Sequence, residues 1–179
     1  QYYQPDNAVL IVAGRFDETR VLAQINTLFG KIPKPMRVIA PTYTAEPVQD
    51  GERSVTVRRS GGTQFVGAGY HVAPSGHPDA AALQVLARVL ADAPSGRLHR
   101  GLVESKLATR LDVSAVSNLE PGYRIFGAVV PKDAPLAPAQ DALLKVLEDL
   151  KSQPVTEEEV ARARQAIAKN VELAMNDSA

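Results

Sequence analysis

The sequence predicts an α+β fold in which an antiparallel or mixed sheet carries its helices mainly on one face. Two pairs of strand-like runs are each joined by a tight turn, at Gly61-Gly62 and at Glu120-Pro121-Gly122, and tight turns join antiparallel strands. Between and after these pairs, apolar residues recur at helical spacing, which predicts helices that each bury one face. The chain is 45% hydrophobic, which is enough for such a core.

The N-terminal part of the chain predicts a strand, a helix and a long connection. The apolar run Ala8–Gly14 (AVLIVAG) is short enough for a fully buried strand. Asp17 is the expected N-cap of a helix that ends before Gly30, because these residue types are favoured at those two positions. Prolines then crowd residues 31–50, which indicates a stiff connection over the surface.

Two strand-like runs follow this connection. Residues 53–59 (RSVTVRR) alternate between polar and apolar side chains, and residues 63–72 (TQFVGAGYHV) form the second run after the glycine turn. Gly67 and Gly69 fall on the same face as Phe65. Glycines on one face of a strand predict that some element packs closely there.

The rest of the chain predicts four helices and two strands. The helices carry apolar stripes, and the strands either alternate or are nearly all apolar. In chain order these elements are helices over 77–92 and 96–106, strands over 109–116 and 123–130, a helix over 137–151, and a last helix that opens at Thr156.

Two of these helices have recognisable start signals. Ser95 is the expected N-cap of the helix over 96–106. Thr156 and Glu159 match the capping box T-x-x-E. The longest run of like charge, Glu157 to Glu159, predicts a solvated helix start whose carboxylates favour the helix dipole.

Composition excludes several kinds of protein. The 20 basic and 20 acidic residues give a net charge of zero, which argues against a nucleic-acid or membrane-surface partner. The absence of cysteine excludes disulfides, thiol nucleophiles and Cys-based zinc sites, but leaves the compartment open. No stretch approaches the roughly 18 apolar residues of a membrane span. The chain begins with Gln1 and ends in an unfinished helical pattern, so we expect a piece of a longer protein.

The residues that could carry chemistry form no catalytic pattern. None of the three histidines, His71, His77 and His99, lies in H-E-x-x-H or H-x-x-E-H, the spacings that put two zinc ligands on one helical face. The G-x-S-x-G elbow is missing, and Gly67-Ala68-Gly69 lacks the third glycine of a phosphate loop. The sequence therefore predicts no catalytic, cofactor-binding or metal-binding residue in this chain.

Several segments nevertheless form an ordered set. They are YYQPDNA (2–8) running into VLIVAGRFD (9–17), FGKIP (29–33), HPD (77–79), SGRL (95–98), LVE (102–104) and KLA (106–108). In this order and spacing they resemble the insulinase/pitrilysin family of zinc peptidases, which also includes the mitochondrial processing peptidases. The resemblance extends over nearly the whole chain.

The resemblance implies a role within a larger peptidase. Family members consist of similar α/β domains, of which the catalytic one carries H-x-x-E-H and a downstream Glu, while the following domain has lost these ligands. Residues 1–179 are similar to that second, inactive domain in long bacterial members, taken as a single domain. The implied cofactor is zinc in a domain upstream of Gln1, with none in this chain. The implied partners are the sister domains and a peptide substrate, with no nucleic acid or membrane.

One substrate-binding feature of the family can be checked position by position. In some family domains an Arg and a Tyr in a helix-to-strand segment help to bind the peptide. When the family segment is aligned on Leu107-Ala108, these positions hold Val103 and Thr109. Both groups are therefore lost, and the resemblance carries no site residue into this chain.

Two other functions stay open. The chain could serve a structural or interaction role in an inactive family relative that has no peptidase activity, or it could be an independent enzyme whose chemistry is built from loops. The resemblance favours a non-catalytic domain that walls the substrate chamber of a zinc endopeptidase. We also expect this chain, on its own, to expose an apolar patch where a sister domain belongs.

Overall fold

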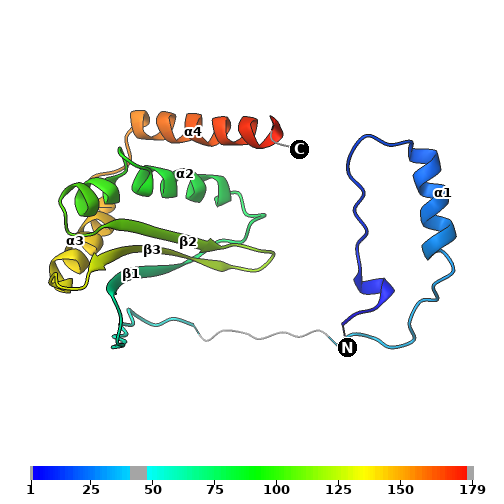
Figure 1. Cartoon of the computed structure of the whole chain (residues 1–179), viewed down its shortest axis with the longest axis horizontal. Helices are drawn as coiled ribbons and strands as arrows, with labels where there is room; N and C mark the ends of the chain where they lie inside the picture. The colour runs from blue at the N-terminus through cyan, green and yellow to red at the C-terminus, as the bar shows by residue number, and fades with distance from the viewer. Residues whose placement is uncertain (1, 41–47, 177–179) are drawn as a thin grey trace. The chain divides into compact units, whose positions relative to one another are not determined.

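The computed structural model describes residues 2–40 and 48–176 and divides the chain into two compact units, Gln1–Thr56 (unit 1) and Val57–Ala179 (unit 2) (Figure 1). Each unit is described separately. The central part of the predicted proline-rich connection, residues 41–47, lies outside the described residues. The assignment of 1–179 to one domain stays a prediction.

The sheet of unit 2 has three antiparallel strands in the order β1-β3-β2. The strands are β1 (Thr63–Val72), β2 (Arg110–Val116) and β3 (Gly122–Pro131). Gly127 of the central strand pairs with Gly67 on one side and with Asp112 on the other. The predicted antiparallel pairing of the runs over 109–116 and 123–130 is confirmed by the pair β2 and β3, whereas the run over 63–72 pairs with β3 and not with 53–59.

Helices cover one face of this sheet. They are α2 (Ala80–Ala91), the π-helical η2 (His99–Glu104), α3 (Leu136–Glu148) and the short η3 (Asp149–Lys151). The core between helices and sheet includes the five largest fully buried side chains, and these are Leu90, Leu98, Leu102, Val130 and Leu143. The α+β class with helices mainly on one face is therefore confirmed.

The last helix, α4 (Glu157–Asn176), packs along α2 and lies above it in Figure 1. Only Glu159 and Ala163 of α4 are buried. Val171, Leu173 and Met175 near its end are 53%, 56% and 74% exposed. Among the described helices, none combines the length and apolar character needed to cross a membrane.

Unit 1 contains a short 3-10 turn, η1 (Pro5–Asn7), and one helix, α1 (Glu18–Phe29). The carboxylate of Asp17 accepts a hydrogen bond from the backbone N–H of Arg20 at 2.9 Å, so the predicted N-cap is confirmed. A second polar contact links distant parts of this unit. The Arg37 guanidinium donates to Oε1 of Gln4 at 2.9 and 3.2 Å, and the Gln4 amide donates to the Arg37 carbonyl at 3.3 Å.

The predictions of strands over 8–14 and 53–59 are wrong. Within the described residues, both segments are unpaired and belong to no sheet. Val9 and Ile11 are 87% and 81% exposed, and Val55 is 84% exposed. An apolar or alternating pattern predicts that a segment favours strand pairing, but pairing also requires a neighbouring strand edge. The described chain supplies no such partner at these segments.

Candidate functional site

The three histidines lie on three separate elements of unit 2. His71 is in β1, His99 is in η2, and His77 precedes α2. Nδ1 of His77 accepts a hydrogen bond from the backbone N–H of Asp79 at 3.2 Å, while Nδ1 of His99 lies 3.9 Å from a carboxylate oxygen of Glu104. In the part of the chain that the structure describes, no three His, Cys, Asp or Glu side chains come together as a possible metal site.

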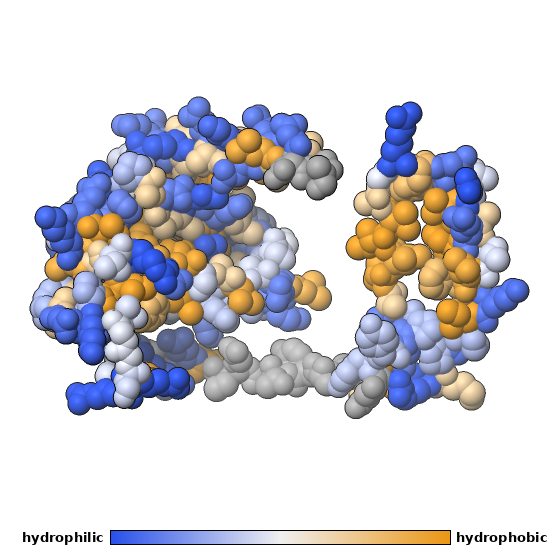
Figure 2. All heavy atoms as spheres, in the orientation of Figure 1, coloured by the Kyte–Doolittle hydropathy of each residue, from blue (hydrophilic) through white to orange (hydrophobic). Residues whose placement is uncertain are grey.

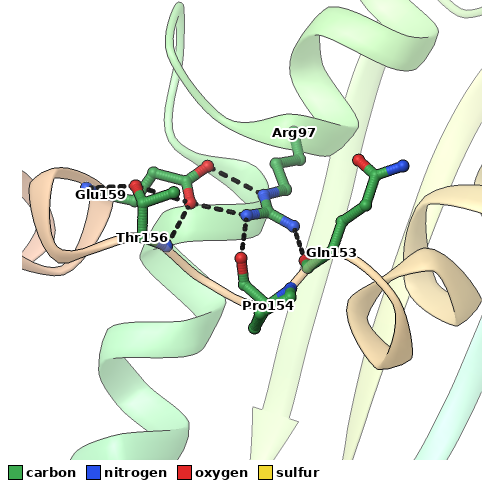
Figure 3. Close-up of polar contacts among 5 residues, drawn as sticks. All are labelled: Arg97, Gln153, Pro154, Thr156 and Glu159. Carbon is green, nitrogen blue, oxygen red and sulfur yellow. Dashed lines mark hydrogen bonds and ion pairs between the residues drawn. The ribbon is translucent and has the colours of Figure 1, made fainter.

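The most elaborate polar cluster of unit 2 joins the start of η2 to the start of α4. Arg97 donates from Nε and Nη2 to the two carboxylate oxygens of Glu159, at 2.8 and 2.6 Å (Figure 3). It also donates from Nη1 to the Gln153 carbonyl at 2.6 Å and from Nη2 to the Pro154 carbonyl at 2.9 Å. A bidentate pair of this kind fixes both distance and orientation. We call Arg97, Glu159 and these two carbonyls the Arg97 anchor.

Glu159 also closes the capping box that the sequence predicts. Its Oε2 accepts from the backbone N–H of Thr156 at 2.9 Å, and its own N–H donates to Oγ1 of Thr156 at 3.3 Å. The reciprocal bonds satisfy backbone groups at the first turn of α4. The capping box is therefore confirmed.

The prediction of a solvated run from Glu157 to Glu159 is wrong for one residue. Glu157 and Glu158 are exposed, but Glu159 is only 9% exposed. Its carboxylate points at Arg97, which is 62 positions away in the sequence. A run of like charges indicates a solvated face only when no distant partner exists, and the run itself contains no information about that partner.

The Arg97 anchor determines the protonation state of Glu159. The hydrogen bonds from the Arg97 guanidinium, together with those from Thr156 and against the opposing effect of burial, lower the pKa of this carboxyl from 4.5 to about 2. The same contact raises the pKa of Arg97. A carboxylate that stays ionised and has both oxygens in use is a poor general base or metal ligand. The cluster can orient α4, and its geometry provides no catalytic group.

The prediction that Ser95 caps the following helix is also wrong. The backbone N–H of Arg100 donates to the Gly96 carbonyl at 3.0 Å, and η2 has no side-chain cap. Gly96 lies so close to α2 that a Cβ there would meet the Leu90 carbonyl oxygen at 2.7 Å. Close approach of the two backbones therefore requires a glycine next to Arg97, and no local signal in the sequence reports this approach.

The face of the sheet opposite the helices is open and largely apolar. Phe65, Val116 and Tyr123 share this face by strand register and are 52%, 40% and 45% exposed. The Phe65 ring lies over glycines, since a Cβ on Gly127 would come within 2.3 Å of its Cζ and one on Gly67 within 2.8 Å of its Cε1. The prediction that another element packs closely over Gly67 and Gly69 is therefore wrong among the described residues, because the close neighbours of these glycines are Phe65, Phe126 and Ile125 of the sheet itself.

This open face, defined by Phe65, Val116, Tyr123 and the glycines beneath the ring, carries charge mainly along β2. There Arg110 and Asp112 lie 3.8 Å apart and neutralise each other. The register also places His71 of β1 and Ser114 of β2 on this face. An exposed apolar surface with few charged groups can contact a peptide or another domain.

The two positions that correspond to the family's Arg and Tyr lie at the end of η2 and just before β2. Val103 is half-buried in η2. Thr109 donates from Oγ1 to the Val129 carbonyl at 3.1 Å. Neither side chain supplies a cation or a phenol.

Comparison with known sequences gives one consistent result. The family described as the Peptidase M16 inactive domain matches residues 1–167. The chain is 29% identical over 166 residues to the zinc protease PqqE of Helicobacter pylori, a match that covers 91% of this chain and 37% of PqqE.

Solved structures agree with the sequence comparison. The crystal structure of an inactive peptidase domain from Bordetella parapertussis is 39% identical, with a TM-score of 0.60 over 69% of this chain and 67% of that one. The crystal structure of a protease from Helicobacter pylori is 26% identical, with a TM-score of 0.85 over 98% of this chain and 43% of that one. The chain thus spans 37% of PqqE and 43% of the solved Helicobacter pylori protease, less than half in both comparisons.

Proposed function

The chain belongs to the Peptidase M16 inactive domain family, and from this membership we propose that it is the non-catalytic, chamber-forming domain of a zinc-dependent metalloendopeptidase. The proposal covers the parent protein as well, since PqqE, of which this chain matches 37%, is a zinc protease. In the parent, sister domains of the same type would be the partners of this chain, and a peptide would be the substrate.

The observation that carries the proposal is the contrast between the two faces of the sheet in unit 2. One face is closed by helices that share a core with Phe126 and Val130. The other face presents Phe65 and Tyr123 at about half exposure, with little charge in its central strand. A wall of this kind suits a chamber that encloses a peptide without reacting with it.

The chemistry would belong to another domain of the parent. A bound zinc polarises water and a carboxylate acts as base in peptidases of this kind. Within this chain, the Arg97 anchor keeps Glu159 ionised and occupied, so its role is to hold α4 in place. The peptide would lie in the chamber as an extended strand against a sheet edge.

Zinc content and peptidase activity, measured on this chain and on the full-length parent, test the proposal. We expect zinc and chelator-sensitive peptide cleavage in the parent, and neither in the isolated chain. Tight stoichiometric zinc binding by the isolated chain would contradict the proposal. It would make His71, His77 and His99 the candidate zinc ligands. If the parent also lacks zinc and activity, the structural role in an inactive relative becomes the better description.

A further inference from the structure

Unit 1 is a folded element without a core of its own. No residue of α1 is buried, and among the described residues of this unit only Gln4 is buried. Most of the apolar stripe of α1 is exposed to solvent, with Leu22 at 60%, Leu28 at 68% and Phe29 at 50%, while Val21 and Ile25 are half-buried. Helical stability in proteins comes mainly from packing an apolar face, so this helix lacks its main source of stability in the isolated chain.

The extended segment over 8–14 has the same property on both of its faces. Val9 and Ile11 point to one side of an extended chain and Leu10 and Val12 to the other. These four side chains are 87%, 81%, 55% and 44% exposed. Strands that are apolar on both faces belong to sheets covered on both faces. In the space-filling view, hydrophobic residues gather over unit 1 (Figure 2).

Polar contacts within unit 1 give it a defined structure. The reciprocal hydrogen bonds between Gln4 and Arg37 join positions 33 residues apart, and Asp17 caps α1. Gln4 and Arg37 flank both the apolar segment 8–14 and α1, so their hydrogen bonds hold the segment and the helix together in one unit. An exposed apolar surface of this kind marks an interaction site.

The comparisons indicate what covers this surface. The Helicobacter pylori protease matches 98% of this chain, a share that must include most of unit 1, while this chain makes up only 43% of that protein. The same units therefore recur inside a chain whose larger part lies outside them. A domain in that larger part belongs to the same polypeptide. It can therefore cover the apolar side chains of unit 1 whatever the protein concentration.

We propose that unit 1 is the docking element by which this domain joins a sister domain of the parent chain. The segment over 8–14 adds as a strand to a free edge of the sister domain's sheet, and Leu22, Leu28 and Phe29 of α1 pack against the surface of that sheet. Strand addition supplies backbone hydrogen bonds, and the alternating side chains supply specificity. The inference rests on the proposed function in one respect, namely that the partner is a domain of the same peptidase.

Hydrogen exchange of segment 8–14, followed by mass spectrometry in the full-length parent and in this chain alone, tests the proposal. We expect exchange in the parent to be slower on the order of 100-fold than in the isolated chain. Ile11→Asp in the parent should abolish this protection. The matched control is Val48→Asp, at a side chain that is 89% exposed and outside the proposed surface, and it should leave the protection intact.

Three outcomes would overturn the docking proposal. They are fast exchange of 8–14 in the parent, equal protection in the monomeric isolated chain, and protection that appears in the isolated chain only as its concentration rises, which would assign the surface to a second copy. None of these readouts depends on zinc. A parent that protects this segment but lacks zinc and peptidase activity would uphold the docking and overturn only the proposed function.

Discussion

Unit 1 and unit 2 carry the same kinds of apolar pattern, yet only unit 2 buries them. In unit 2, Leu98 and Leu102 are 0% exposed, whereas Leu22 and Leu28 in the helix of unit 1 are 60% and 68% exposed. Both units have correctly capped helices and internal polar contacts. The difference teaches that an amphipathic pattern specifies a surface to be covered, and that the cover can come from outside the chain that contains it.

The largest expected effect on stability comes from a substitution in the core of unit 2. Leu102→Ala should lower the free energy of unfolding by about 2–5 kcal/mol, because it leaves a cavity at a fully buried position. Leu28→Ala in unit 1 removes the same atoms from an exposed position and should change the free energy of unfolding by less than about 0.5 kcal/mol. Urea denaturation of the isolated chain measures both. Equal effects would show that the two units do not differ as described.

The next effect concerns the Arg97 anchor. Arg97→Met leaves the buried Glu159 carboxylate without its counter-ion and should lower the free energy of unfolding by about 2–3 kcal/mol. Glu159→Gln should have a similar effect, and the double variant should be less destabilised than the sum of the two. Urea denaturation measures all three variants as a double-mutant cycle.

An exposed ion pair on the same helix provides the control for this cycle. Arg162 contacts Glu158 at 3.3 Å, with side chains 46% and 86% exposed. Arg162→Met should change stability by less than about 0.5 kcal/mol. A change as large as that of Arg97→Met would mean that burial does not distinguish the two pairs.

The anchor also predicts how stability depends on pH. The folded-state pKa of Glu159 is about 2, below its ordinary value of 4.5, so its contribution is fully present above about pH 5 and is lost as the pH falls towards 2. The lowered pKa corresponds to a contribution of about 3 kcal/mol. Denaturation curves recorded between pH 6 and about pH 2 should therefore converge for the original chain and Glu159→Gln. A constant difference across this range would contradict the assignment.

The smallest effect concerns the open face. Gly127→Ala forces the Phe65 ring to move, since the new Cβ would lie 2.3 Å from Cζ. The ring is half exposed and can rotate, so the loss should be about 1 kcal/mol or less in urea denaturation. Phe65→Ala in the same chain should relieve most of this loss. The control is Gly61→Ala, where a Cβ meets nothing within 4 Å.

Local signals in the sequence predicted much of this structure. The cap at Asp17, the capping box of Thr156 and Glu159, and the antiparallel pair of β2 and β3 all follow from residues close together in the chain. The same information located the helices of unit 2 to within a few residues, because their apolar stripes are buried by neighbours in the same unit.

Features that depend on distant residues were missed. The burial of Glu159 depends on Arg97, and the start of η2 depends on how closely Gly96 approaches Leu90. The segment 8–14 has the composition of a buried strand but no pairing partner in the described chain. The absence of site residues stays a prediction, since the family positions at Val103 and Thr109 were judged from sequence alone.

Limited trypsin digestion of this chain alone is the most direct test of the central claim, that unit 2 is self-sufficient and unit 1 needs the parent. We expect the first cuts after exposed residues of unit 1 such as Arg15 and Lys31, while a fragment from β1 to α3 persists. Cleavage after Arg124 in the central strand at the same rate as after Lys31 would contradict the claim, because it would show that neither unit is folded independently of the parent.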